Sequence, residues 1–197
     1  RVQRFAPKLM RSLERAIAFC QSTLSYGRAQ EAAPDRRMIL IEPVVLEVRE
    51  TAGLANDATI AWVAAIERGL AVDADPDQLF RVLLNLVRNA AQALETHASG
   101  DGGPLQIRIT GKREGAVAIL EVSDTGPGVP PGVREHLFEP MVSTKMEGTG
   151  LGLAISRGFV EAMHGTITAA NRSDRRGAVL TIRLPVPAQT RALDTAA

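Results

Sequence analysis

Asp124 stands at the end of an apolar run, and two glycines, Gly126 and Gly128, follow it within four residues. An aspartate carboxylate can accept a hydrogen bond from the amino group of a nucleotide base, and glycines let the main chain pass close to a ligand. The same pattern suits a plain turn at the end of a strand, because aspartate before Thr-Gly is a common turn former. Residues 122–128 are therefore one half of a candidate nucleotide site.

A second glycine-rich stretch, Gly-Thr-Gly-Leu-Gly-Leu, occupies residues 148–153 and opens a helical pattern. Main-chain N–H groups at the start of a helix attract phosphate oxygens. The candidate phosphate-binding residues here are Gly148, Thr149, Gly150, Leu151 and Gly152. One glycine-rich stretch alone is more often a turn, but two at this separation predict an ATP pocket with a flexible lid between them.

The segment between the two stretches contains Leu-Phe-Glu-Pro at residues 137–140 and Ser-Thr-Lys at residues 143–145. Thr144 and Lys145 are candidate cofactor-binding residues, because the lysine ammonium could reach terminal phosphate oxygens as a point charge. An exposed lysine without that role explains Lys145 equally well. Phe138 is expected to pack the lid against the body of the domain.

The helix with the strongest sequence pattern begins after Asp75, which is a good N-cap, with Pro76 in the first helical position. Gln78 stands three residues after the cap, as in a capping box. The apolar positions that follow fall on one side of the helix: Val82, Leu83, Leu86, Ala90 and Leu94. This pattern predicts an amphipathic helix with one face in the core.

Asn85 and Asn89 lie on the opposite side of this helix, together with Arg81 and Gln92. Asparagine amides compete for backbone groups, so two of them in a good helix need a reason. A solvated polar face is one reason. The other is a ligand, because a carboxamide oxygen suits Mg²⁺ that is shared with phosphate oxygens. The glycine-rich stretches favour the ligand.

The remaining patterns predict shorter elements. They indicate a strand at 38–41, a helix from Pro43 to about Gly53, a hairpin of 59–66 with 70–72, a strand pair at 105–110 and 117–122, a helix at 151–163, and strands at 166–170 and 179–184. Antiparallel pairs mixed with helices predict an α+β fold, a two-layer sandwich with helices on one face of a mixed, mostly antiparallel sheet.

Four regions follow from the same patterns. Residues 1–30 show an apolar stripe at helical spacing, residues 31–37 suit a linker, residues 38–185 form the predicted domain, and residues 186–197 suit a flexible tail. The apolar stripe needs a partner surface, which is either the chain's own domain or another helix, for example in a second copy.

Composition excludes several classes of protein. Over 197 residues the net charge is +1 with one Trp and one Tyr, which gives no basic, aromatic surface for nucleic acid. No apolar run approaches the ~20 residues that span a bilayer, and the first residues show no signal-peptide pattern, so no membrane contact and a cytoplasmic location are expected for these residues. The single cysteine, Cys20, cannot form an internal disulfide.

Asn-x-x-x-Asn-Ala at residues 85–90, the Asp124 stretch, the lid segment and the 148–153 stretch occur in an order that resembles the ATP-binding catalytic domain of two-component sensor histidine kinases. That domain belongs to the superfamily of gyrase, the Hsp90 chaperones and the mismatch-repair ATPases. The resemblance covers residues 38–185 and implies a Bergerat-type ATP-binding fold. Residues 1–30 resemble the second helix of the dimerising hairpin by pattern alone.

The resemblance also implies roles. Asn89 would hold Mg²⁺ with Asn85 in support, Asp124 would accept from the adenine amino group, and Lys145 would act at the phosphates. The ATPases that resemble this domain carry Glu at the position of Asn85, where it acts as a general base. An amide cannot take a proton, so Asn85 favours transfer to a histidine over hydrolysis.

The three histidines, His97, His136 and His164, do not stand in the setting that the family uses for its phosphoacceptor. The resemblance therefore implies an ATP- and Mg²⁺-dependent histidine kinase core that phosphorylates a histidine outside this sequence. Expected partners are a phosphoacceptor histidine domain, a response regulator and, through residues 1–30, a second copy of the chain. The alternative is an inactive phosphotransfer or scaffold protein with the same fold.

Overall fold

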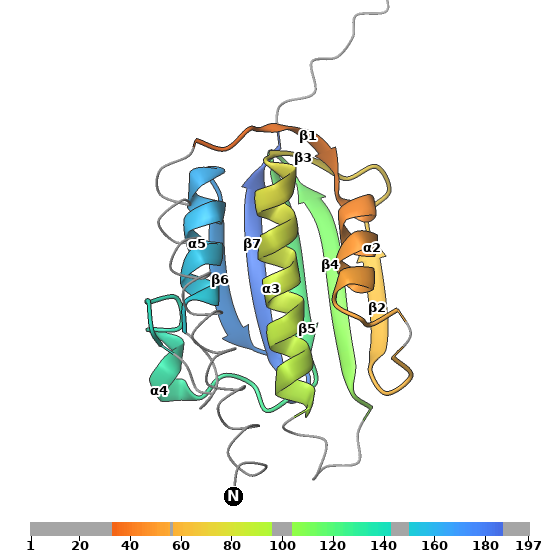
Figure 1. Ribbon diagram of the computed structural model, residues 1–197, viewed down its shortest axis with the longest axis vertical. Coiled ribbons are helices and arrows are strands. Elements are labelled where there is room, and N and C mark those ends of the chain that lie inside the picture. The colour runs from red at the N-terminus through yellow and green to blue at the C-terminus, as the bar shows by residue number, and fades with distance from the viewer. Residues whose placement is uncertain (1–32, 56, 96–103, 143–149, 187–197) are drawn as a thin grey trace, which may run out of the picture.

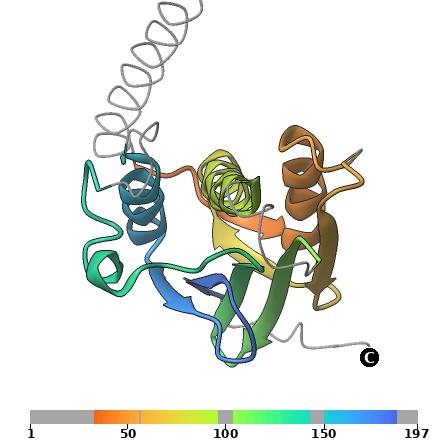
Figure 2. The same ribbon diagram turned by 90° about the horizontal axis from the view of Figure 1, so that it is seen from below.

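The computed structural model describes residues 33–55, 57–95, 104–142 and 150–186. These residues form two layers, a five-stranded sheet and the helices α2, α3 and α5, which all cover one face of that sheet (Figure 1). The end-on view shows the three helices together on one side of the strands (Figure 2). The predicted α+β sandwich is confirmed. The helix predicted within residues 1–30 and residues 187–197 of the predicted tail lie outside the described residues. The tail does not begin at Val186 as predicted, because this residue is buried and its N–H donates to Ala116 O at 2.8 Å.

The elements follow one another in an order that mixes strands and helices. They are β1 (Arg37–Leu40), α2 (Ile41–Thr51), β2 (Ala61–Ile66), β3 (Ala71–Ala74), α3 (Pro76–Glu95), β4 (Gln106–Glu114), β5 (Val117–Asp124), α4 (Pro131–Arg134), α5 (Gly152–Ala162), β6 (Thr166–Asn171) and β7 (Ala178–Pro185).

The main sheet has the strand order β2-β4-β5-β7-β6. Strands β4 and β5 form the predicted antiparallel hairpin, and Gly115 in its turn has a φ of 63°, which favours glycine. Strand β5 also pairs antiparallel with β7, and β7 with β6. Only β2 runs parallel to its neighbour β4 among the described strands, so the sheet is mixed and mostly antiparallel, as predicted.

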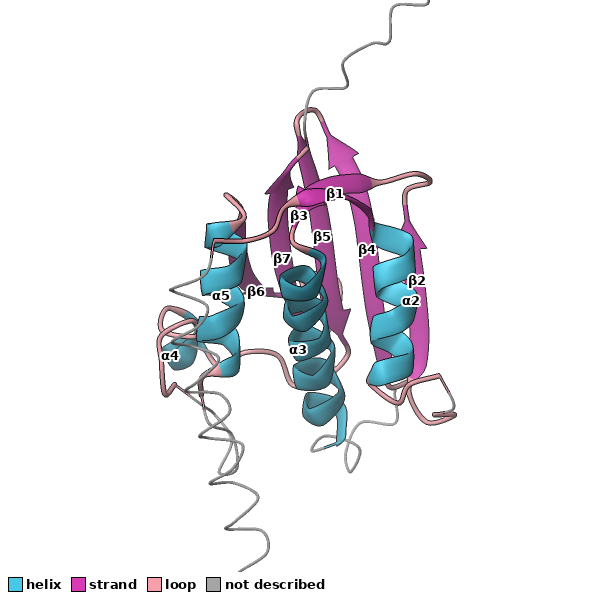
Figure 3. Cartoon of the chain, turned by 45° about the horizontal axis from the view of Figure 1, so that its top comes forward, coloured by secondary structure: helices cyan, strands magenta, loops and turns pink. Residues whose placement is uncertain are grey.

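The predicted hairpin of residues 59–66 with 70–72 is wrong. The tight turn exists, since Gly69 has a φ of 73° and Leu70 N donates to Glu67 O at 3.0 Å. After this turn, however, β3 leaves β2 and pairs antiparallel with β1 in a separate two-stranded sheet. That small sheet crosses the end of the helical layer where α3 begins (Figure 3).

Helix α2 begins at Ile41, two residues before the predicted start at Pro43. The N–H groups in the first turn of a helix have no partner within the helix, so proline is tolerated there. Ile41 is fully buried, and its N–H donates to Leu70 O at 3.0 Å, which joins the start of α2 to the end of the turn before β3.

The N-terminus of α3 is capped as predicted, but only from one side. Oδ1 of Asp75 accepts hydrogen bonds from the N–H groups of Asp77 and Gln78, each at 3.0 Å. In a capping box, Oε1 of Gln78 would accept a hydrogen bond from Asp75 N. Among the described residues this bond is not formed, because Oε1 of Gln78 is buried without a partner. The aspartate cap alone therefore fixes the start of this helix.

The core lies between α3 and the sheet. Leu79, Leu83, Leu86 and Leu94 of α3 are fully buried, as are Ile107 and Ile109 of β4 and Ile182 and Leu184 of β7. This packing holds one face of α3 rigidly and orients its other face toward α5 and the loop after β5. None of the helices that the structure describes is long and apolar enough to cross a bilayer.

Candidate nucleotide site

One stripe of α3 connects the two glycine-rich stretches. Residues 85, 89 and 93 are spaced by four and therefore lie in line along a helix. The predicted polar face divides here: Arg81 and Gln92 are exposed, whereas Asn85 and Asn89 are half-buried. Asn85 faces α5, to which it is hydrogen-bonded, and a fully solvated polar face does not explain this contact.

At one end of this stripe, Asn85 contacts the start of α5. Its Nδ2 donates a hydrogen bond of 2.9 Å to Oγ of Ser156, and that hydroxyl donates to Gly152 O at 3.0 Å. A Cβ added at Gly152 would lie 2.6 Å from Oδ1 of Asn85. Glycine at position 152 is therefore required for α3 and α5 to approach this closely.

At the other end of the stripe, the loop after β5 lies against Ala93. A Cβ added at Gly126 would lie 3.4 Å from Cβ of Ala93. Asp124 is 3% exposed, and its Oδ1 accepts from Gly126 N at 2.8 Å and from Ala178 N at 3.3 Å. The carboxylate therefore shapes its own loop. A carboxylate can accept about four hydrogen bonds, so this role is compatible with binding a base as well.

Asn89 lies between these two ends of the stripe, one helical turn from each. The structure thus brings together Asn85, Asn89, Asp124, Gly126 and the first residues of α5 around one face of α3. The N-terminus of α5 lies beside Asn85, and the N–H groups at a helix N-terminus give this region a partial positive charge.

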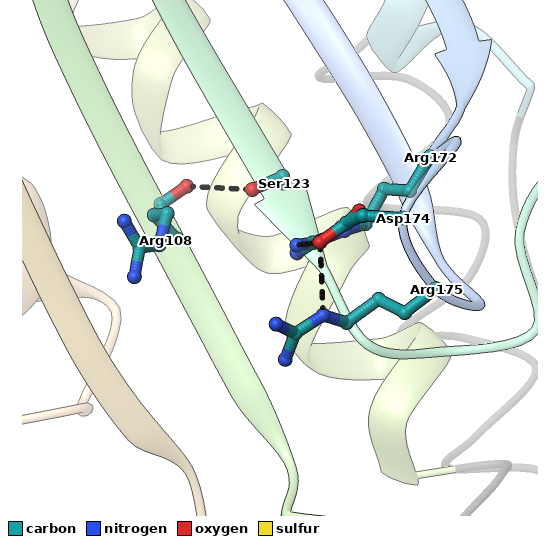
Figure 4. A network of polar contacts seen from close by, with 5 residues as sticks. All are labelled: Arg108, Ser123, Arg172, Asp174 and Arg175. Carbon is teal, nitrogen blue, oxygen red and sulfur yellow. Dashed lines mark hydrogen bonds and ion pairs between the residues drawn. The ribbon is translucent and has the colours of Figure 1, made fainter.

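The turn between β6 and β7 closes the far side of the Asp124 loop. Gly177 packs directly against the carbonyl of Asp124, leaving no room for a side chain. Asp174 accepts from Arg172 at 3.0 and 2.9 Å and from Arg175 at 3.1 Å within this turn (Figure 4). Hydrogen bonds from Arg172 hold the pKa of the Asp174 carboxyl well below its usual value.

The base of the predicted lid is closed by a contact between its two ends. Met141 N donates to Gly150 O at 3.0 Å, and a Cβ added at Gly150 would lie 2.6 Å from the carbonyl carbon of Met141. Both residues have a φ of 66°. Phe138 is half-buried and packs against the core, as predicted. Four predicted site residues, Thr144, Lys145, Gly148 and Thr149, lie outside the described residues.

Two of the histidines are described. His136 follows α4, and its Nδ1 lies 2.8 Å from Oε1 of Glu139, which raises the pKa of the His136 imidazole through a hydrogen bond and charge attraction. His164 lies two residues after the end of α5 and has a φ of 61°, a left-handed conformation that is common just after a helix C-cap. Each has a local structural role at its position.

The residues present are compatible with Mg²⁺ only if phosphate oxygens complete its shell. No group of three or more His, Cys, Asp or Glu side chains is placed to hold a metal ion in the described part of the chain. Mg²⁺ commonly takes one or two protein oxygens, with water and substrate phosphates as its other ligands. The half-buried carboxamide of Asn89, one helical turn from Asn85 on α3, fits that arrangement.

Sequence patterns missed two residues of this region, Ser156 and Asn171. Ser156 is 1% exposed and lies among helix-forming residues, where a serine attracts no notice. Asn171 ends β6, and its side chain contacts Val129, 42 residues earlier in the chain. Neither contact is encoded by local spacing, so no pattern in one sequence reveals it.

Residues 74–188 match the family described as histidine kinase-, DNA gyrase B-, and HSP90-like ATPases. Because this match covers more than half of the chain, the chain belongs to that family. Within it, the similar proteins are sensor histidine kinases, and the resemblance found in the sequence is confirmed.

One curated relative is the C4-dicarboxylate transport sensor protein DctS of Rhodobacter capsulatus, 37% identical over 80% of this chain and 23% of its own length. Another is the sensory histidine kinase/phosphatase NtrB of Escherichia coli O157:H7, 44% identical over 47% of this chain and 28% of its own length. The chain thus spans about a quarter of the length of these relatives. Among solved structures, the catalytic domain of histidine kinase ThkA has a TM-score of 0.66 and 28% identity, covering 77% of this chain and 95% of that one.

Proposed function

We propose that residues 38–185 are the catalytic core of a two-component histidine kinase, which binds Mg-ATP and transfers the γ-phosphoryl group to a histidine outside this sequence. The observation that carries this proposal is the stripe of α3 at residues 85, 89 and 93. It has the start of α5 at one end and the Asp124 loop at the other. A nucleotide lying along this stripe would have its base near Asp124 and its phosphates near Gly152.

The base would be recognised by Asp124, whose carboxylate can accept from an exocyclic amino group. Gly126 and Gly128 would let the loop pass beside the base. The phosphates would lie at Gly150, Leu151 and Gly152, where the α5 N–H groups attract negative charge. In the lid, Gly148, Thr149, Thr144 and Lys145 would add further donors to the phosphates.

Asn89 would hold Mg²⁺, and the ion, when bound, would neutralise charge on the phosphate oxygens. Asn85 would position that assembly, because its amide is fixed between α3 and the Ser156 hydroxyl. Phosphoryl transfer requires mainly positioning and charge stabilisation from the protein. Lys145 would supply further positive charge to the terminal phosphate.

The choice of acceptor follows from the chemistry of Asn85. An amide does not take a proton at neutral pH, so this position cannot activate water or a hydroxyl group. The nitrogen of a neutral imidazole has its own lone pair and needs no such base. We infer that the acceptor is a histidine on another domain of the same protein or on a partner, and that a response regulator receives the phosphoryl group afterwards.

We also propose roles for the remaining regions. Residues 1–30 would be the second helix of a dimerising hairpin, residues 31–36 a linker that ends where β1 begins, and residues 187–197 a tail. Dimerisation would bury the apolar stripe of residues 1–30 against a second copy. Met38 and Leu40, each more than half exposed on β1, stand just after this linker.

A transfer assay tests the proposal. The chain is incubated with γ-labelled ATP, Mg²⁺ and separately purified phosphoacceptor hairpins from several related sensor kinases. We expect acid-labile, base-stable label on at least one hairpin, and little phosphate release without a hairpin. Steady phosphate release that needs no hairpin would identify an ATPase instead. A folded chain that binds nucleotide but labels no hairpin would contradict the kinase assignment.

A further inference from the structure

The loop that carries Gly126 and Gly128 is held by a side chain at the end of β6, the edge strand of the sheet. Oδ1 of Asn171, the last residue of β6, accepts a hydrogen bond from Val129 N at 2.7 Å. Nδ2 of the same side chain donates to Val129 O at 3.0 Å. One carboxamide thus satisfies both main-chain polar groups of Val129.

This contact depends on the residue at position 128. Gly128 has a φ of 80°, and a Cβ added there would lie 2.9 Å from Oδ1 of Asn171. Only a glycine at 128 therefore lets the loop reach the carboxamide. Asn171 and Gly128 are complementary, because the glycine provides the space that the asparagine occupies.

Several hydrogen bonds hold the turn that follows Asn171. Arg172 N donates to Gly177 O at 3.0 Å, and the Arg172 guanidinium forms a bidentate salt bridge with the Asp174 carboxylate. Gly177 packs against the carbonyl of Asp124, and the N–H of Ala178 reaches the Asp124 carboxylate at 3.3 Å. The turn therefore touches the Asp124 loop at its beginning, and Asn171 touches it at Val129.

We propose that Asn171 is a positioning residue for base recognition: it holds the loop of residues 125–129 in its binding shape before the nucleotide arrives. The inference rests on the proposed nucleotide-binding function, and it adds a residue outside the two glycine-rich stretches. A loop that is ordered in advance loses less conformational freedom on binding, which raises affinity without adding a contact to the ligand.

The test compares the chain with its Asn171→Ala and Asn171→Asp variants. Calorimetry measures the affinity for a non-hydrolysable ATP analogue, and amide hydrogen exchange of the nucleotide-free protein measures protection at Val129. We expect Asn171→Ala to bind about fivefold to tenfold more weakly, the effect of losing two hydrogen bonds, and to lose protection at Val129. Ser173→Ala, an exposed change in the same turn, is the matched control and should behave like the unmodified chain.

The pH dependence of nucleotide affinity in the Asn171→Asp variant distinguishes a loss of the Val129 hydrogen bonds from a general loss of stability. An ionised carboxylate can still accept from Val129 N, but it repels Val129 O and cannot donate to it. A protonated carboxyl can do both. The affinity of Asn171→Asp, relative to the unmodified chain at the same pH, should therefore recover in part as the pH is lowered from 7 toward 4, near the ordinary aspartate pKa of about 3.9, while Asn171→Ala shows no recovery.

The outcomes separate this inference from the proposed function. If the unmodified chain binds no adenine nucleotide, the proposed function fails. If it binds and Asn171→Ala binds equally well, the positioning role is overturned while the nucleotide site stands. Lost protection at Val129 with unchanged affinity would also overturn the role, because the loop would then be held by Asn171 without any effect on binding.

Discussion

Asn85 of α3 and Ser156 of α5 are joined by a hydrogen bond of 2.9 Å, although they lie 71 residues apart in the chain. The Ser156 hydroxyl in turn donates a hydrogen bond to Gly152 O, in the first turn of α5. The amide that the sequence marks as a candidate ligand is thus fixed in orientation by a buried hydroxyl. Its oxygen is directed toward Gly152, where the phosphates are proposed to lie.

Removing this hydroxyl tests the link. Ser156→Ala leaves the Asn85 amide without its acceptor, so we expect a loss of about 1 kcal/mol in the free energy of unfolding. Nucleotide affinity should fall as well, because the amide can rotate. Urea denaturation and calorimetry measure the two effects. Ser123→Ala removes a buried hydroxyl whose bond to Arg108 O is long, at 3.4 Å, and should change neither quantity appreciably (Figure 4). An Asn85-dependent site would be contradicted by a Ser156→Ala variant with unchanged affinity.

Alanine substitutions at two glycines of α5 should have different effects on nucleotide binding and on stability. At Gly152 the new Cβ would lie 2.6 Å from Oδ1 of Asn85, so Gly152→Ala should weaken nucleotide binding by at least about tenfold through displacement of that side chain. At Gly158 no heavy atom lies within 4 Å of the new Cβ. Gly158→Ala should therefore stabilise the fold by about 0.5–1 kcal/mol with unchanged binding. Equal effects of the two substitutions on binding would contradict the close approach of α3 and α5.

These contacts show which features of the fold the sequence predicts. The start of α3 is predicted correctly because its cap is local: Asp75 and Gln78 are three residues apart. The pairing of β2 is not predicted correctly. Its partner β4 lies 45 residues further along the chain, and the pattern of a strand does not specify its partner. A turn that is correctly placed at Gly69 therefore led to a hairpin that does not exist.

The candidate site divides in the same way. Asn85, Asn89 and Asp124 are found from residue type and spacing, and their roles follow from the family resemblance. Ser156 and Asn171 act through contacts with residues 71 and 42 positions away, which one sequence does not reveal. Packing also decides that Asn85 faces α5, while Arg81 on the same side of the helix stays exposed.

Asp124 offers a test of base recognition. In Asp124→Asn the remaining oxygen can still accept from Gly126 N, but the amide nitrogen presents N–H groups to the base. Affinity for an ATP analogue should fall by at least about tenfold, because an amino group would then face a donor. A nucleotide with hypoxanthine, which carries a 6-oxo group in place of the amino group, should lose much less. Asp77→Asn, an exposed change in the first turn of α3, is the control. Equal losses for both bases would show that Asp124 acts only on the loop.

The pair of His136 and Glu139 predicts a pH dependence close to the lid. Glu139 raises the folded-state pKa of His136 above its ordinary value, first by a hydrogen bond and then by charge attraction. The stabilisation is therefore fully present below the unfolded pKa of about 6.5 and is lost as the pH rises through the folded-state pKa. NMR titration should show that Glu139→Gln lowers the pKa of His136 markedly, and that Glu135→Gln, which removes a weaker attraction, lowers it less. A pKa that is insensitive to Glu139 would contradict the contact.

The proposed metal-dependent nucleotide site is tested most directly by calorimetric titration of a non-hydrolysable ATP analogue, with and without Mg²⁺. The chain, Asn89→Ala and the exposed control Arg88→Ala are compared. We expect saturable binding that Mg²⁺ strengthens in the chain and in the control. In Asn89→Ala we expect the Mg²⁺-dependent gain to fall by about tenfold, or about 1.4 kcal/mol. A folded chain that binds no analogue, or an Asn89→Ala variant that keeps the full gain from Mg²⁺, would contradict the account.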